Sequence, residues 1–455
     1  MAVLPFANLS ADKENEYFSD GLAEDIIDAL TRVPGLQVAA RTSAFAFRGK
    51  ETDVREIGAR LKVATILEGS VRRAGNRVRV TAQLVNAADG YHLWSQRFDR
   101  EMSDVFAIQD EISQAVVEKL RLQLSPENRP ASRRTENLNA YHLFLKGRHC
   151  LYKGIPSEIA KAKGFFEQAA LLDPNYALPH LGISEYYWLC TYWTYMHPLD
   201  GLPRAKAAAE EALRCDPGLA EAHAMLATLK GCFDLDWEGA DWEFRRAREL
   251  DPASVTVRDR YANYYLRPLG RLEEAIAELE RALELDPLSL FLHYHLQCLL
   301  HLSRRYDRAV SVAESALALD PDYFPVLWVL AVTHAICGRH EEALALGRKA
   351  VELSGRSPMV TAALATVHAL MGRKDEADSI MEELHRLSLL KPVPAFCFVW
   401  IHIGMRHAEN ALKWIERGIE ERHPLFVMQL GSEPFYDALR PDPRFQALLR
   451  KLHIA

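Results

Sequence analysis

A recurring pair of alanines organises most of this 455-residue chain. In each pair the alanines lie seven residues apart, almost two helical turns, so both project from one face of a helix. In most pairs a proline, which cannot continue a helix, follows five residues after the second alanine. After a first step of 43 residues the pairs recur every 34 or 35 residues, and this period indicates an array of helix pairs. The pairs are Ala162/Ala169, Ala205/Ala212, Ala240/Ala247, Ala275/Ala282, Ala309/Ala316 and Ala343/Ala350, continued by single alanines at Ala377 and Ala411.

A second small residue is expected where the two helices of a pair touch, because helices approach closely only where the side chains between them are small. About twelve residues before the first alanine the sequence supplies such residues. They are Ala227, Ala331 and Ala365, with Ser184, Ala262 and Gly147 in repeats that contain insertions. Three positions depart from the pattern: Gln297 replaces a small residue, and Leu384 and Gly418 replace the second alanine. We therefore predict looser packing toward the C-terminus.

This pattern resembles the tetratricopeptide repeat family, over roughly residues 137–430. The resemblance implies an all-α superhelix whose inner face is lined by the first helix of each repeat. At groove-facing spacing the first helices carry aromatic and mostly uncharged side chains, which favour an apolar or aromatic peptide, or an element of the same protein, in the groove. We predict a peptide-binding groove at Asp259, Asn263, Tyr294, His301 and Trp328. Other residues at this spacing are Tyr141, Phe144, Arg148, Glu185, Trp188, Phe291, Phe396 and Trp400, of which about half are expected to pack between repeats.

The first 124 residues show a different pattern, in which short apolar runs alternate with amphipathic helices. In residues 77–85, for example, apolar residues alternate with polar ones, and Gly75 and Asn76 before them predict a hairpin turn. The predicted order is β-α-β-α-β-β-β-α, which makes a small mixed α/β domain. The expected strands are residues 1–6, 36–40, 64–72, 77–85 and 92–98, and the expected helices are residues 19–30, 53–61 and 104–122.

The segments AVLPFANLS, EYFSDGLAEDI and DVREIGARLKVATILEGSVRRAGNRVRVTAQLVNAADGYHLWSQRFDR resemble the TolB amino-terminal-like domain of bacterial regulators. The resemblance covers nearly all of residues 2–122. In that family the domain typically lies between an N-terminal output module and C-terminal tetratricopeptide repeats. The output module is a class III adenylate cyclase, a winged-helix DNA-binding domain or a protein kinase. The resemblance therefore implies a regulatory fragment, and we expect an output module upstream of Met1.

These patterns together predict an α+β chain, in which a small mixed α/β domain precedes an all-α tetratricopeptide-repeat superhelix. We place the TolB-like domain at residues 1–124 and a polar, proline-bearing linker at residues 125–136. About eight helix pairs follow at residues 137–423, and residues 424–455 form a capping segment. A cap is expected because a terminal repeat must cover its own apolar face.

Charge and cysteine usage narrow the function further. The net charge of -7 argues against nucleic acid as the main partner, because neutralising phosphates needs a clustered basic face. The seven scattered cysteines favour buried thiols in a reducing compartment, so we predict a cytoplasmic location. The sequence contains no run of about 18 apolar residues, so it predicts no membrane span. A periplasmic assembly factor is the weaker alternative, because TolB-like domains also occur there.

The sequence contains no constellation that predicts catalysis, a metal or a cofactor. The 17 histidines include no pair at four-residue helical spacing, and there is no nucleophile elbow, phosphate-binding glycine loop or kinase signature. The run Arg41-Thr42-Ser43 follows an expected strand end and could bind an anion through backbone amides, although a turn that satisfies its own backbone is favoured. Arg72, Arg73, Arg77 and Arg79 form a basic hairpin, for which we favour a solvated sheet face.

Two functional hypotheses follow. The leading one is a non-enzymatic module of a bacterial signalling protein that binds a protein or peptide in the repeat groove. The alternative is the regulatory region of an enzyme, a class III adenylate cyclase or a protein kinase, whose catalytic domain lies upstream. The partner, the signal and the oligomeric state are left open by the sequence.

Overall fold

The computed structural model describes residues 1–10, 15–33, 35–50, 52–120, 135–152 and 156–454. Within this part of the chain no helix is long and apolar enough to cross a membrane. The chain forms two compact units. Unit 1 comprises Met1–Ile183, Arg214–Pro217 and Leu283–Ser289, and unit 2 comprises Ser184–Leu213, Gly218–Ala282 and Leu290–Ala455.

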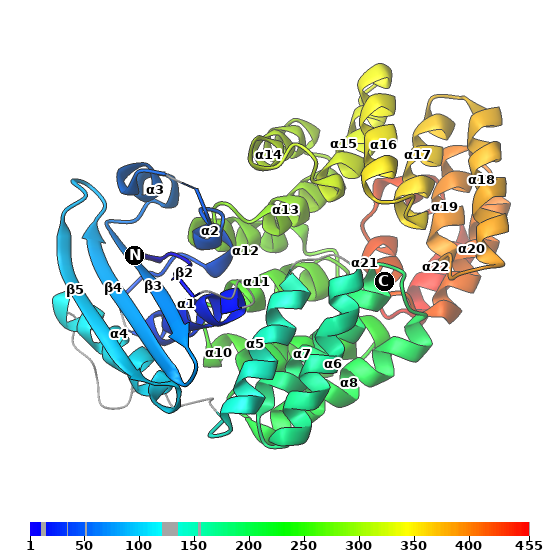
Figure 1. Ribbon diagram of the computed structural model, residues 1–455. Helices are drawn as coiled ribbons and strands as arrows, with labels where there is room; N and C mark the ends of the chain where they lie inside the picture. Colours follow the sequence, from blue (N-terminus) through cyan, green and yellow to red (C-terminus); the bar gives the residue numbers. More distant parts are fainter. Residues whose placement is uncertain (11–14, 34, 51, 121–134, 153–155, 455) are drawn as a thin grey trace. The chain divides into compact units, whose positions relative to one another are not determined.

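Unit 1 contains a five-stranded mixed sheet, drawn as arrows in Figure 1. The short strands β1 and β2 both pair in parallel with β3, while β3, β4 and β5 form an antiparallel meander. The alternation predicted for the second hairpin strand is confirmed: Val78, Val80, Ala82 and Leu84 are buried, and Arg79, Thr81 and Gln83 between them are more exposed. The strands are β1 Ala2–Val3, β2 Ala7–Asn8, β3 Thr65–Ala74, β4 Arg77–Asn86 and β5 His92–Glu101.

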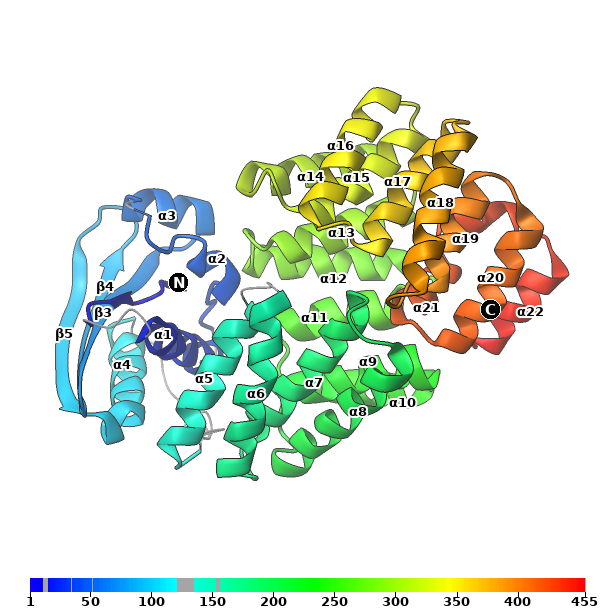
Figure 2. The same ribbon diagram turned by 45° about the vertical axis from the view of Figure 1, so that its right-hand side comes forward.

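Helices cover one face of this sheet. Figures 1 and 2 both show α1 and α4 on the same side of β3 to β5, and Ile108 and Ile112 of α4 are fully buried there. Asp53 caps α3 by accepting a hydrogen bond from the Arg55 N–H at 2.8 Å. The helices are α1 Glu16–Thr31, α2 Arg41–Phe45, α3 Val54–Leu61 and α4 Val105–Lys119, with the 3-10 turn η2 Met102–Asp104 before α4.

The strand predicted at residues 36–40 does not form. This segment makes isolated hydrogen bonds to the N-terminus, where the Ala39 N–H donates to the Met1 carbonyl at 2.7 Å and the Met1 amino group donates to the Gln37 carbonyl at 2.5 Å. No ladder extends from them, and the chain turns directly into α2. The apolar run was a sound signal of burial, since Val38 and Ala39 are buried, but it did not specify a strand.

The rest of the chain consists of antiparallel helices. In Figure 2 the consecutive helices from α13 to α20 lie side by side. Every alanine of the recurring pairs is fully buried, which confirms the role that the spacing predicted for them. The helices are α5 Leu138–Tyr152, α6 Pro156–Leu172, α7 Ala177–Tyr192, α8 Pro198–Cys215, α9 Ala220–Leu229, α10 Trp237–Leu250, α11 Val255–Tyr261, α12 Leu272–Leu285, α13 Leu290–Leu302, α14 Tyr306–Leu319, α15 Phe324–Ile336, α16 His340–Leu353, α17 Pro358–Leu370, α18 Lys374–Ser388, α19 Ala395–Gly404, α20 Ala408–Glu421, α21 Pro424–Leu430 and α22 Pro443–Lys451.

Two repeats of unit 2 end their first helix in a wider, π-helical turn. These turns are η4 Lys230–Asp234 and η5 Ala262–Leu266. At the end of η5 the Arg267 N–H donates to the Ala262 carbonyl, five residues back, at 3.0 Å. Wide turns of this kind rotate the following side chain relative to a regular helix, and they occur frequently at functional sites.

The expected loosening toward the C-terminus is not what the structure shows. Leu384 is fully buried in place of the second alanine. A Cβ on Gly418 would lie 2.8 Å from Cε1 of Phe426, so the glycine allows a closer approach than alanine would. Gln297 is also fully buried and donates to the Val326 carbonyl at 3.2 Å. The departures from the repeat pattern therefore mark specific contacts rather than slack packing.

Candidate functional site

All five residues of the predicted groove lie on the first helices of the middle repeats, and all five are buried within unit 2. Asp259 accepts a hydrogen bond from Asn263 Nδ2 at 3.1 Å and contacts His295 Nδ1 at 2.6 Å. These three side chains therefore contact one another, while Asn263 Oδ1 and His295 Nε2 are buried without a partner among the described residues. Sequence spacing placed Asp259 and Asn263 on one face correctly, but it did not show that His295 would cover them.

Tyr294 and Trp328 belong to an aromatic layer. The ring centroids of Tyr294 and Trp328 are 6.4 Å apart, and Trp328 stacks on Trp400 with centroids 5.9 Å apart and an interplanar angle of 20°. Burial raises the pKa of the Tyr294 hydroxyl well above its usual value, so this group stays neutral. The spacing predicted Tyr294 and Trp328 as groove residues and named Trp400 only among the other residues at that spacing.

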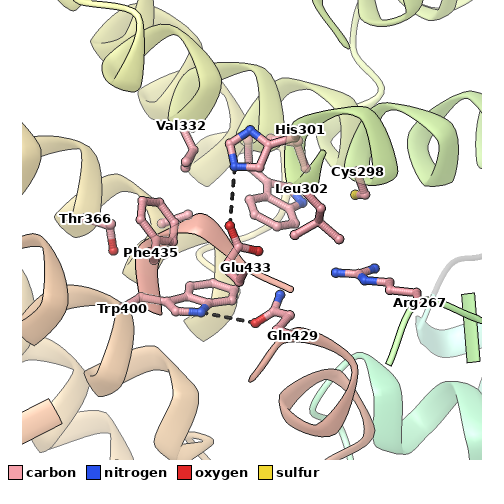
Figure 3. Close-up of a pocket in the computed structure, with 13 residues that line it drawn as sticks. Arg267, Cys298, His301, Leu302, Val332, Thr366, Trp400, Gln429, Glu433 and Phe435 are labelled. Carbon is pink, nitrogen blue, oxygen red and sulfur yellow. Dashed lines mark hydrogen bonds and ion pairs between the residues drawn. The ribbon is translucent and has the colours of Figure 1, made fainter. Parts of the chain in front are cut away.

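His301 connects the repeats to the C-terminal segment, residues 424–440. Its Nδ1 lies 2.8 Å from Thr333 Oγ1, and its Nε2 lies 3.4 Å from Glu433 Oε1. On the same segment Gln429 accepts a hydrogen bond from Trp400 Nε1 at 3.2 Å. The contacts of His301 with Glu433 and of Trp400 with Gln429 are drawn as dashed lines in Figure 3. The C-terminal segment, with its 3-10 turn η6 Pro434–Ala438, thus lies against residues that were expected to face a peptide.

These residues enclose a cavity of about 30 Å³. His301 and Trp328 were predicted as groove residues and Trp400 was named at the same spacing, whereas the prediction did not include the other lining residues. Arg267 follows a π-helical turn that no sequence signature announced, and Glu433 and Phe435 lie in a segment expected only to cap the array. The cavity is lined by Arg267, Cys298, His301, Leu302, Trp328, Val329, Val332, Ala363, Thr366, Trp400, Gln429, Glu433 and Phe435.

The first repeat, in unit 1, has its inner face covered by α1. Arg148 lies 2.6 Å from Glu24 Oε2 and 3.7 Å from Asp25, and the Tyr141 hydroxyl donates to Asp25. Arg148 and Tyr141 were named for groove-facing spacing, and both are used in contacts within the protein. Arg41 also pairs with Glu24, at 2.5 Å. The acidic side chains of Glu24 and Asp25, in the middle of α1, therefore belong to a network paired with α5 and Arg41.

The Arg41-Thr42-Ser43 run does bind an anion, but the anion belongs to the same chain. The Ser43 N–H donates to Asp286 Oδ1 at 2.8 Å, the Ser43 hydroxyl donates to the same oxygen, and the Leu288 N–H donates to Ser43 Oγ at 2.7 Å. Asp286 is buried, and this burial raises its pKa despite these hydrogen bonds. The loop after α12 thus packs on α2 within unit 1.

The basic hairpin lies on the open face of the sheet, where it pairs with β5. Arg77 and Arg79 lie 2.9 Å and 2.6 Å from the carboxylate of Asp99. Hydrogen bonds from Arg79 and Arg77 hold the pKa of Asp99 below its usual value. This arrangement agrees with the favoured interpretation of a solvated sheet face.

Comparisons with known proteins agree on the repeats and add a relationship for the N-terminal region. The second domain of HilA/YgeH-like transcriptional regulators matches residues 1–115, and a tetratricopeptide repeat matches residues 259–287. The helical array is thus of the tetratricopeptide type. The TolB-like assignment of residues 1–124 stays a prediction.

Among curated relatives, putative adenylate cyclase 3 of Rhizobium meliloti (strain 1021) is 39% identical over 231 residues, which cover 50% of this chain and 39% of the relative. Transcriptional regulator HilA of Salmonella paratyphi A (strain ATCC 9150 / SARB42) is 24% identical over 294 residues, which cover 63% of this chain and 51% of HilA. The chain therefore spans about half or less of the length of these relatives.

Among solved structures, the human IFIT1 dimer with m7Gppp-AAAA has a TM-score of 0.50 at 14% identity, covering 76% of this chain and 77% of IFIT1. At this identity the similarity concerns the fold alone. It supports a long helical superhelix without specifying a ligand.

Proposed function

We propose that this chain is a non-catalytic regulatory region of a bacterial signalling protein and that it acts by binding a protein or peptide through its repeats. One observation carries the proposal: the chain resembles proteins named for two different outputs, an adenylate cyclase and a transcriptional regulator. A region common to both performs neither output by itself. Tetratricopeptide arrays offer extended surfaces for protein binding, which is what such a shared region would supply.

In finer detail, we propose that residues 1–124 are a TolB amino-terminal-like domain, that residues 125–136 link it to repeats at residues 137–423, and that residues 424–455 close the array. The output module would lie on the same polypeptide. A class III adenylate cyclase is the specific alternative in which the chain is the regulatory part of an enzyme, and the 39% identity to a putative adenylate cyclase favours it over a kinase.

Catalysis is tested with the purified chain incubated with ATP or GTP and magnesium. No turnover above a mock preparation is expected, and nucleotide consumption would contradict the proposal.

Expressing the complete reading frame with and without this region tests regulation. An output activity that persists but no longer responds to the partner supports the regulatory role.

The proposed partner site is the inner face around Asp259, Asn263, Tyr294, His301 and Trp328. His301 and Trp328 face residues of the C-terminal segment, so a partner reaching them would replace Glu433 and Phe435. A bound partner and the C-terminal segment would therefore compete for one surface.

This competition gives a direct experiment. Phe435→Ala removes the segment's half-buried aromatic contact with His301, whose ring centroid lies 6.4 Å away, and leaves the repeats unchanged. Partner binding should tighten in this variant, and a synthetic peptide of residues 424–440 should displace the partner where a scrambled peptide does not. Phe165→Ala, at a half-buried phenylalanine on α6, serves as the matched control. Unchanged affinity in the Phe435 variant would place the partner elsewhere.

A further inference from the structure

Arg267 is the least compensated charge in the interior of unit 2. The side chain is only 3% exposed, and it forms no hydrogen bond or ion pair with any of the residues that the structure describes. Its Nε is buried without a partner. A buried guanidinium cannot release its proton, and leaving it unpaired is strongly unfavourable. This cost requires a physical explanation.

Among the described residues, no carboxylate forms an ion pair with Arg267. Burial raises the pKa of the Cys298 thiol to about 12, so the thiol is neutral at physiological pH. Glu433 is the one carboxylate among the cavity's lining residues, and its Oε1 lies beside His301 rather than Arg267. In Figure 3 the guanidinium of Arg267 points toward Leu302, Glu433 and Gln429 across the cavity. The positive charge therefore faces the cavity, and the Glu433 carboxylate lies across it without forming an ion pair with Arg267.

Trp328, one of the lining residues, carries a second donor without a partner in the part of the chain that the structure describes, and the cavity also has an apolar wall. Trp328 Nε1 is buried and has no partner among the described residues. The stacked rings of Trp328 and Trp400, together with Leu302, Val332 and other aliphatic side chains, line the remaining surface. Ligand pockets commonly combine an apolar wall with a few convergent polar groups of this kind.

We propose that this cavity binds a small monocarboxylate, with the carboxylate on Arg267 and the Trp328 indole N–H and a short carbon body against the tryptophan pair. A guanidinium matches the planar carboxylate with two parallel hydrogen bonds. The cavity of about 30 Å³ has room for roughly two water molecules, so it suits a carboxylate with a very short carbon body and excludes an aromatic acid or a peptide unless its walls move. Glu433 nearby disfavours a dianion such as phosphate.

The site stands independently of the proposed protein partner, although the C-terminal segment forms one of its walls. The C-terminal segment contributes Gln429, Glu433 and Phe435 to the lining. An occupied cavity therefore changes the strength of the contacts between that segment and the repeats. A small carboxylate would then regulate access to the inner face.

Thermal unfolding of the full chain tests the site with formate, acetate and propionate at constant ionic strength. We expect a saturable rise in melting temperature and a change in tryptophan fluorescence from Trp328 and Trp400. Acetamide, the neutral counterpart of acetate, should have no effect, and phosphate should have a weaker one. An equal response to phosphate would overturn the assignment to a carboxylate and indicate a general anion site.

Substitution of the arginine gives the decisive comparison. Arg267→Met should abolish the carboxylate response and at the same time raise the melting temperature of the ligand-free chain, because it removes an unpaired buried charge. Arg271→Gln is the matched control, since Arg271 is exposed and pairs with Glu274 at 2.6 Å, and it should respond as the wild type does. Glu433→Gln should tighten binding several-fold by removing the competing negative charge.

Two results would overturn the proposal. A carboxylate response that persists in Arg267→Met would place the ligand elsewhere. The second result is that the wild-type chain responds to none of the three acids and that Glu433→Gln binds them no more tightly. This result would show that Arg267 is only a structural residue. If Arg267→Met fails to fold, the Glu433→Gln titration still decides between these outcomes.

Discussion

The interior of unit 2 fixes the protonation state of individual histidines. His423 begins α21, and its Nδ1 accepts a hydrogen bond from the Leu425 N–H at 3.2 Å. A ring nitrogen that accepts a hydrogen bond carries no proton, so the cap requires neutral imidazole. Burial lowers the pKa of His423 to about 3. The start of the C-terminal segment therefore depends on a histidine that resists protonation.

We expect this histidine to make unit 2 sensitive to acid. Because its pKa is lower in the folded state than the usual 6.5, its contribution to stability is complete above pH 6.5 and is lost as the pH falls toward 3. At pH 4.5 the loss amounts to about 2 to 3 kcal/mol. His423→Asn keeps a capping side chain that does not titrate. Urea midpoints at pH 7 and 4.5 should converge for the two proteins on acidification, and parallel midpoints would contradict the argument.

The recurring alanines give a second prediction at the residue scale. Ala275 and Ala411 are both fully buried, so replacing either with leucine overpacks a helix contact at a cost of about 1 to 3 kcal/mol. We expect similar losses in the denaturation midpoint for both variants. A much smaller loss for Ala411→Leu would restore the looser C-terminal packing that the repeat departures had suggested.

At the scale of elements, the sequence located most helices and strands because their periodicity is local. It could not show which face an element would cover. The spacing of Tyr141 and Arg148 on α5 was read correctly, but the acidic side chains of α1 that meet them lie more than 100 residues away in the sequence. The buried arrangement of Arg267 was missed for a related reason, since a π-helical turn is not encoded by hydrophobic spacing.

A pair of helical glycines tests packing at this scale. Gly418→Ala places a Cβ 2.8 Å from Phe426 Cε1, so α20 and α21 must separate, and we expect a loss of about 1 to 3 kcal/mol. Gly164→Ala is the matched control, because a Cβ there meets nothing within 4 Å, and the better helix propensity of alanine should add about 0.5 to 1 kcal/mol. The opposite signs can be measured by urea unfolding. Equal effects would mean that Phe426 moves aside freely.

At the scale of the whole molecule, the period of the alanines predicted the helical array, while the arrangement of the N-terminal region against the first repeat could not be inferred. Within unit 1, Asp20, Glu24 and Asp25 of α1 take their partners partly from α5. A domain that ended at residue 124, as the sequence suggested, would leave these buried carboxylates without Arg148, His149 and Tyr141. The part of the chain that the N-terminal domain needs for its stability therefore extends beyond residues 125–136 and includes α5.

Two fragments test that conclusion. Residues 1–124 contain the complete sheet, and residues 1–183 add α5, α6 and the start of α7. Removing the partner of a buried carboxylate commonly costs about 3 to 5 kcal/mol, so the shorter fragment should unfold at a clearly lower urea concentration, monitored by circular dichroism. Arg148→Met in the longer fragment should reproduce much of the loss, whereas Lys163→Met, whose partner Glu167 is exposed on α6, should not. Equal midpoints for the two fragments would show that α1 holds its charges without the first repeat and that the domain ends where the sequence placed it.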